Sequence, residues 1–137
     1  MDDAVTRYCA ASEANDVDAM VATMAPDVEL NSPLVGRMTF KGRDDVGELL
    51  GKVYATLTDL RWGQPLGQGS ERVAISDAKV AGLRITDAMV FDLSEDGHIR
   101  RIRPHLRPWL ATTVFALMLG PKVARRFGIV VRALRSR

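Results

Sequence analysis

The spacing of apolar residues changes partway along this 137-residue chain, and that change constrains the fold more than any other feature. Up to about residue 57 the apolar residues recur at intervals of three and four, which is the period of amphipathic helices. From about residue 60 to residue 106 they alternate, which is the period of strands with one buried face. Helices followed by a run of antiparallel strands predict an α+β fold.

Three helices are predicted in the first part of the chain, each with one apolar face. They cover residues 2–14, 17–24 and 45–57, the last two capped by Asp16 and Asp44. Between the second and third helices, Val28 to Asn31 reads as a short strand, and residues 33–42 read as an irregular loop.

Four strands are predicted after the third helix. They lie around Leu60 and Trp62 and over residues 72–81, 84–93 and 98–106. Gly82 marks one turn, and the sequence Glu95-Asp96-Gly97 is a strong signal for a hairpin between the last two strands. The length of the chain is that of one domain.

A basic helical tail follows the last strand. We divide the chain into a domain over residues 1–107 and a tail over residues 108–137, with helices at 109–119 and 121–135 separated by Gly120-Pro121. The formal charge is −8 over residues 1–96 and +10 over residues 97–137, which contain no acidic residue. Such a split favours an anionic partner for the tail, which is a membrane, a nucleic acid or the acidic body of the protein itself.

Three segments carry a resemblance to a known family. They are VTRYCAASEANDVDAMVATMAPDVELNSPLVG (5–36), FKGRDDVGELLGKVY (40–54) and VFDLSEDGHIRRIRPHL (90–106). The chain resembles the nuclear transport factor 2-like superfamily, which includes SnoaL-like polyketide cyclases, ketosteroid isomerases and limonene epoxide hydrolases. The resemblance implies a cone-shaped, curved antiparallel sheet with three N-terminal helices around a pocket, and homodimers through the outer face of the sheet. That fold hosts enzymes, binding modules and assembly domains, so the reaction stays open.

Tyr8 is the residue that the resemblance carries over most directly. Ketosteroid isomerases, a standard example of tuned acid–base chemistry, use a tyrosine at this position together with an aspartate base and a protonated aspartate. A phenol in a dry pocket stabilises an enolate oxygen because its dipole is already aimed. Ser32 and Met89 replace the two aspartates here, so the usual steroid isomerisation is not expected. Tyr8 either binds an oxyanion or fills the core face of the first helix.

Asp87 is the carboxylate that strand alternation places beside Met89. Residues two apart on a strand point to the same face, so Asp87 faces the pocket if Met89 does. Burial raises the pKa of a carboxyl in an apolar pocket, which suits a general acid or base. The alternative is an exposed carboxylate at the start of the strand, paired with Arg84.

Asn31 matches a pocket asparagine that helps to position the attacking water in limonene epoxide hydrolases. The late aspartate of that hydrolase pattern is missing, because Pro104 stands at its position. Asn31 is therefore a candidate for positioning water or a turn residue that bonds its own backbone before Pro33.

A further group is predicted to bind the ligand. The family register turns Arg100 and Ile102 inward, where Arg100 binds a carboxylate or pairs with Asp87, unless it is solvated at the start of its strand. The predicted ligand-binding residues are Met20, Met24, Tyr54, Trp62, Met89, Arg100 and Ile102.

Together these residues predict a small-molecule binding protein or enzyme with an apolar pocket for a polycyclic, terpenoid or lipid-like ligand. The chemistry would be proton transfer or water addition by Asp87 with Tyr8 and Asn31. The alternative is a non-catalytic dimerisation or membrane-associated module whose cavity is only core, and whether any reaction is catalysed stays open. One cysteine and two histidines predict no structural zinc site, and no cofactor is expected.

The expected location is the cytoplasm, with the periphery of a membrane as the alternative. Asp2 and Asp3 have the wrong charge for the start of a signal peptide. The tail either packs on the domain or a dimer mate, or lies on an anionic membrane as an amphipathic helix over residues 121–135. Nucleic acid is the least expected partner, because the tail lacks interleaved aromatic residues.

Overall fold

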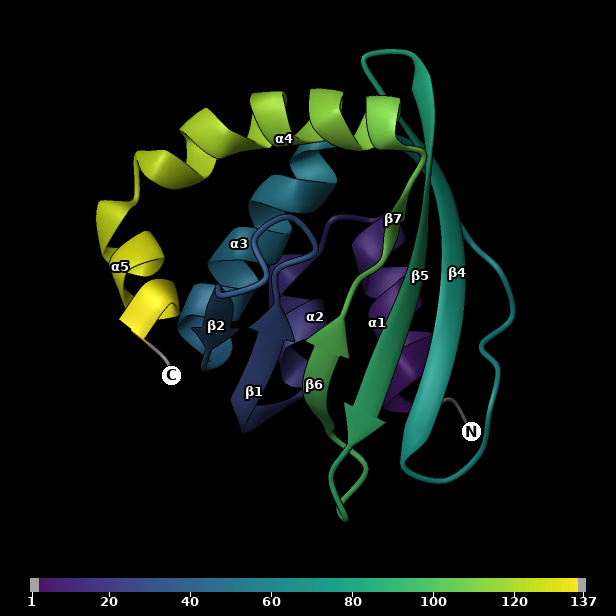
Figure 1. Ribbon diagram of the computed structural model, residues 1–137. Helices are drawn as coiled ribbons and strands as arrows, with labels where there is room; N and C mark the ends of the chain where they lie inside the picture. The colour runs from purple at the N-terminus through teal and green to yellow at the C-terminus, as the bar shows by residue number, and fades with distance from the viewer. Residues whose placement is uncertain (1–2, 136–137) are drawn as a thin grey trace.

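The computed structural model describes residues 3–135, in which a seven-stranded sheet carries helices against one side (Figure 1). The helices are α1 (Ala4–Glu13), α2 (Val17–Ala22), α3 (Arg43–Thr56), α4 (Trp109–Ala124) and α5 (Phe127–Arg135). The strands are β1 (Met24–Asn31), β2 (Thr39–Lys41), β3 (Thr58–Trp62), β4 (Glu71–Val80), β5 (Leu83–Leu93), β6 (Ile99–Arg103) and β7 (Leu106–Arg107). Their order is β2-β1-β6-β5-β4-β3, with β7 beside β5. The predicted α+β fold with a curved sheet is confirmed.

The first two helices form where the sequence predicts them. The carboxylates of Asp3 and Asp16 cap α1 and α2 by accepting the backbone N–H groups of Thr6 and Ala19. The predicted inward face of α1 is buried. Residue 2, with which the first predicted helix begins, lies outside the described residues.

Two elements near the start of the sheet differ from prediction. Helix α2 ends at Ala22, and Met24 already belongs to β1, because the residue before Pro26 is disfavoured in a helix. Strand β2 lies within the segment predicted as a loop, and it pairs antiparallel with β1 through Phe40 and Leu30. Three residues are too few for alternation to be recognised from sequence alone.

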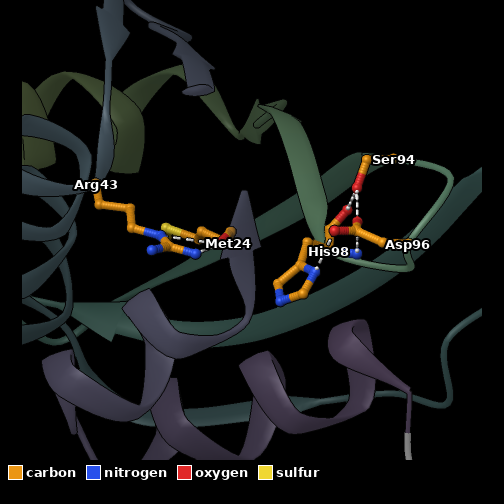
Figure 2. A network of polar contacts seen from close by, with 5 residues as sticks. All are labelled: Met24, Arg43, Ser94, Asp96 and His98. Carbon is orange, nitrogen blue, oxygen red and sulfur yellow. Dashed lines mark hydrogen bonds and ion pairs between the residues drawn. The ribbon is translucent and has the colours of Figure 1, made fainter. Parts of the chain in front are cut away.

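Helix α3 begins at Arg43 rather than after an Asp44 cap. Its N-cap is Gly42, which has a φ of 88° and makes no side-chain capping bond. Arg43 instead donates two hydrogen bonds to the backbone oxygen of Met24, at 3.0 Å from Nε and 2.6 Å from Nη2 (Figure 2). The start of α3 is therefore tied to the start of β1.

The hairpin between β5 and β6 has the predicted turn. Gly97 adopts a φ of 85°, which favours glycine. The Asp96 carboxylate accepts hydrogen bonds from the Ser94 hydroxyl and the His98 N–H, and these bonds lower the pKa of Asp96 to about 2 (Figure 2). The turn is held by its own polar side chains.

The last predicted strand, over residues 98–106, is two strands in the structure. Pro104 cannot donate a backbone hydrogen bond, and it falls between β6 and β7. Strand β6 runs parallel to β1 and antiparallel to β5, whereas β7 pairs with the first half of β5.

The tail folds against the domain. Helix α4 continues through Gly120 and Pro121, where a break was predicted, and the chain bends instead around Arg125 and Arg126. The inner face of α4 packs against β4 and β5 through Ala111, Phe115 and Leu119. Among residues 3–135 no helix is long and apolar enough to span a bilayer.

Candidate functional site

The sheet, α3 and α4 enclose a cavity of about 70 Å³, several times the space that one water molecule needs. Its wall is mostly aliphatic, with few polar side chains. The lining residues with polar groups are Ser32, Tyr54, Ser76 and Asp87. The apolar ones include Leu30, Phe40, Leu50, Met89, Phe115 and Leu119. An apolar cavity with a few convergent polar groups is the usual form of a small-molecule site.

Asp87 lies on the cavity wall, on the same face of β5 as Ile85 and Met89. Its Oδ1 accepts a hydrogen bond of 3.0 Å from the backbone N–H of His105, a group that lies in the break between β6 and β7. Burial raises the pKa of Asp87 to about 7, and the hydrogen bond opposes the rise. Both protonation states of Asp87 are therefore populated near neutral pH.

Tyr54, on α3, presents a phenol to the same cavity. Its hydroxyl lies 2.6 Å from the hydroxyl of Tyr8, which is fully buried on α1 behind it. Burial raises the pKa of both phenols, and the negative charge of Asp87 raises them further. Asp87 therefore lies within electrostatic range of a neutral, hydrogen-bonded tyrosine pair.

Tyr8 belongs to an aromatic cluster that fixes the position of this pair. Its ring meets those of Phe91, Tyr54 and Trp62 edge-on, at centroid distances of 5.2, 6.3 and 6.3 Å. The Trp62 indole donates a hydrogen bond of 2.7 Å to the Ser12 hydroxyl. The cavity face of α3 is thus supported from behind by packed rings.

The structure divides the predicted catalytic residues. Asp87 lines the cavity, Tyr8 reaches it only through Tyr54, and Asn31 is not among the lining residues. The neighbouring Leu30 faces the cavity, and alternation along β1 directs Asn31 to the other face, where its amide donates to the Thr39 hydroxyl at 3.2 Å.

Arg100 is exposed, contrary to the predicted inward orientation. The pairing of β5 with β6 shifts between Asp92 and Leu93, so that Arg100 is an extra residue in the register. This irregularity breaks the alternation, so that Ile99 is buried in place of Arg100, while Ile102 is buried as predicted. Arg100 therefore does not face Asp87.

The other predicted ligand-binding residues fall into two groups. Tyr54 and Met89 line the cavity. Met20, Met24 and Ile102 are fully buried in the main core, and Trp62 packs at its edge, so these four support the wall from outside.

Sequence reasoning missed several lining residues. Ser76 lies directly opposite Asp87 in the pairing of β4 with β5, and its signal was the inward alternation Ala74, Ser76, Ala78 on the predicted strand. Phe115 and Leu119 close the cavity from the tail, and no motif of the domain points to them. Their helical spacing was the only available signal.

Other reactive groups lie outside the cavity. Cys9 is buried, and burial raises the pKa of its thiol to about 12, so it stays protonated. Across residues 3–135, no group of three or more His, Cys, Asp and Glu side chains is placed to hold a metal ion.

Comparisons with known proteins agree with this architecture. A family model described as the SnoaL-like domain matches residues 5–102. No curated protein sequence matches the chain significantly.

Solved structures match over most of the chain. A protein with a cystatin-like fold from Silicibacter pomeroyi superposes with a TM-score of 0.88 at 23% identity, covering 95% of this chain and 93% of its own. A steroid delta-isomerase from Pseudomonas aeruginosa superposes with a TM-score of 0.81 at 17% identity, covering 91% of this chain and 92% of its own. SalBIII, an epoxide hydrolase/cyclase-like enzyme of pyran ring formation in salinomycin, superposes with a TM-score of 0.64 at 20% identity, covering 79% of this chain and 90% of its own. These identities show a shared fold, and the first match is long enough to include most of α4 and α5.

Proposed function

Because this chain belongs to the SnoaL-like domain family, we propose that its cavity binds a small hydrophobic molecule and that Asp87 transfers a proton on it. One observation carries the proposal: a carboxyl group with a pKa of about 7 stands on the wall of an otherwise apolar cavity. A general base or acid is most effective when its pKa is close to the working pH. Among the matched structures, a steroid isomerase and a cyclase-like enzyme share the fold.

The chemistry that this arrangement supports is enolisation of a ketone. The Asp87 carboxylate removes a proton from the carbon beside the carbonyl, and the electron pair moves onto the carbonyl oxygen. The Tyr54 hydroxyl donates a hydrogen bond to that oxygen while its negative charge develops. When the ketone carries a β,γ double bond, the enolate is a conjugated dienolate, and return of the proton from Asp87 to its γ-carbon completes an isomerisation.

Tyr8 acts on this chemistry through Tyr54. When the Tyr8 hydroxyl donates to the oxygen of Tyr54, the proton of Tyr54 is left to point into the cavity. That donation also makes Tyr54 a stronger donor, because the hydrogen bond from Tyr8 lowers the pKa of Tyr54 against the larger effect of burial. Tyr8 is therefore a positioning residue in this proposal.

The cavity favours a compact ligand of the terpenoid or lipid-like class over a large polycyclic one. Its volume is modest, and the wall is mostly aliphatic. Proton transfer is favoured over water addition, because Asn31 is not on the cavity wall. Ser76 lies opposite Asp87 on the neighbouring strand, so the two side chains form one polar region in an otherwise apolar cavity. This region would orient a single carbonyl group of the ligand.

The test is exchange of the α-protons of compact cyclic ketones, such as 2-tetralone, for deuterium, followed by NMR. We expect Asp87→Asn to slow the catalysed exchange by a factor on the order of 100 or more. Tyr54→Phe should lower the exchange rate about 100-fold, and Tyr8→Phe should lower it less than Tyr54→Phe does.

The matched control is Asp77→Asn, which removes an exposed carboxylate from the neighbouring strand β4. Exchange by this variant should equal that of the unaltered protein. Equal rates with and without the Asp87 carboxylate would contradict the proposal. Failure of the unaltered protein to exceed buffer across a panel of ketones would favour a non-catalytic module whose cavity is only core.

A further inference from the structure

The outer face of α4 is apolar and uncovered in the described chain. Trp109 is 78% exposed, Leu117 71% and Leu110 50%. Thr113, Gly120 and Pro121 complete this face, so no charged residue lies on it from residue 109 to residue 121. An amphipathic surface helix normally turns charged and polar residues outward. We call these six residues the α4 outer face.

The opposite side of the same helix explains why this face is not simply core. Phe115 and Leu119 point inward to the cavity, and Lys122 points inward to the hydroxyl of Thr56 at 2.8 Å. Helix α4 therefore has an inner apolar face that is packed and an outer one that is not. In Figure 1 it lies along one end of the molecule, and the turn between β4 and β5 extends past the start of α4.

Cations stand at both ends of the α4 outer face. Arg107 precedes the helix and Arg125 follows it, both are exposed, and neither makes an ion pair with a described residue. By contrast, Arg126 and Arg132 are neutralised by Glu48 and Asp45 of α3. The chain from residue 97 onward contains no acid that could pair with the free arginines.

We propose that the α4 outer face docks on an anionic lipid surface. The three large apolar side chains would enter the boundary between headgroups and acyl chains, and Arg107 and Arg125 would meet lipid phosphates on either side. A second copy of the chain fits less well, because it would bring another acid-free surface with its own arginines against this one. Trp109 at the edge of the face suits the interface between water and hydrocarbon.

The membrane helix is therefore α4 and not α5, to which the sequence pattern pointed. Most of the apolar side of α5 is already packed, because Ile129 and Ala133 are buried in the main core, and Leu134 is the large apolar side chain that it leaves exposed, at 50%. The ion pair of Arg132 with Asp45, at 2.7 Å from Nε to Oδ2, holds α5 against α3.

The position of α4 joins this surface to the cavity. The segment between β1 and β2 supplies Ser32, Pro33 and Leu34 to the cavity wall, beside Phe115 and Leu119 of α4. Leu34 and its neighbour Val35 are also 39% and 44% exposed. Leu34 thus belongs both to the cavity wall and to the exposed surface of the molecule.

Vesicle flotation of the full chain tests the docking. With vesicles of phosphatidylglycerol and phosphatidylcholine, we expect binding that is at least ten-fold stronger than with phosphatidylcholine alone and that weakens at high salt. Leu117→Ser should weaken binding at least ten-fold. Arg107→Gln and Arg125→Gln should each weaken it about five-fold.

Arg100→Gln is the matched control, because Arg100 is an exposed arginine on β6, outside α4 and its flanks. It should change binding less than two-fold. The four substituted side chains are exposed, so each variant should keep the circular dichroism spectrum of the unaltered chain. In a Trp62→Phe background, emission from Trp109 should shift to the blue when anionic vesicles are added.

Several outcomes would overturn the proposal. The first is absence of binding to anionic vesicles. The second is a loss of binding in Arg100→Gln that equals the loss in Arg107→Gln and Arg125→Gln. The third is Trp109 emission that does not shift when vesicles are added. A lipid-free dimer in sedimentation that Leu117→Ser dissociates would assign the face to a second copy instead. Asp87→Asn should leave flotation unchanged, so the docking surface and the proposed proton transfer can fail separately.

Discussion

The domain over residues 1–107 and the tail over residues 108–135 bury apolar residues in opposite ways. In the domain, α1 and α3 each turn one apolar face toward the sheet and a polar face toward solvent. In the tail, α4 is apolar on both faces, and only the inner face is packed. The difference supports the proposal that α4 also docks on a surface, because a helix that only covered the cavity would need a single apolar face.

The two regions also differ in charge, and part of that difference is used within the protein. Asp45 and Glu48 on α3 form ion pairs with Arg132 and Arg126 of the tail, respectively. The acidic domain thus neutralises the arginines that approach α3, and it leaves Arg107 and Arg125 free at the ends of α4. Packing on the domain therefore uses Arg126 and Arg132, and the proposed attraction to an anionic surface would use Arg107 and Arg125.

The largest expected effect on stability separates the two faces of α4. Phe115→Ala removes a buried ring from the cavity wall and should lower the free energy of unfolding by about 3–5 kcal/mol. Leu117→Ala, two residues further on the outer face, should change it by less than about 0.5 kcal/mol. Chemical denaturation of the two variants measures this contrast. Similar losses would mean that the outer face is packed in solution.

A smaller effect comes from the acidic side chain of the domain's cavity. The folded protein holds a proton on Asp87 up to a pH of about 7, whereas the unfolded chain releases it near pH 4. The unfolded state therefore binds fewer protons in this window, and the Asp87 contribution to the free energy of unfolding falls as pH rises from about 4 to about 7. The loss should be roughly 2–4 kcal/mol.

Denaturation of the unaltered protein and Asp87→Asn at pH 4.5 and 7.5 (roughly the two ends of that window) isolates this contribution. Asp3, Asp77 and Asp96 have lowered pKa values and add stability in the opposite direction, but both proteins share them. As pH rises, the free energy of unfolding of the asparagine variant should increase relative to that of the unaltered protein. A constant difference between the two would show that Asp87 does not titrate in this range.

The smallest expected effect is at the contact between tail and domain. Arg132→Gln removes both hydrogen bonds to the Asp45 carboxylate, at 2.7 and 2.8 Å. Because the arginine is exposed, the melting temperature should fall only slightly, and the fall should shrink at high salt. Arg135→Gln, on the same helix, is the control. A loss as large as that of Phe115→Ala would mean that this ion pair holds the tail in place.

Local patterns predicted the domain better than they predicted the tail. The change of period gives the α+β class, and alternation beside Met89 correctly places Asp87 on the cavity wall. The same alternation fails at Arg100, because a shift in strand pairing depends on the neighbouring strand as well as on its own sequence.

The site was predictable only in part, because it combines distant segments. Tyr54 was predicted as a ligand-binding residue. Its hydrogen bond to Tyr8 could not be predicted, because it depends on how α1 and α3 pack, and the two residues are 46 positions apart in the sequence. The closure of the cavity by Phe115 depends on the path of the tail over the sheet. Helical spacing shows that residue 115 lies on one face, and it does not show what that face meets.

The central claim is that the Asp87 carboxyl stands in an apolar cavity with a strongly raised pKa. Titration of the aspartate carboxyl carbons by NMR, with Asp87→Asn to assign the signal, measures that pKa directly. We predict a midpoint at about 7, and a further change when a compact ketone is added. A midpoint near 4, the value of an ordinary aspartate, would contradict both the buried site and the proton transfer proposed for it.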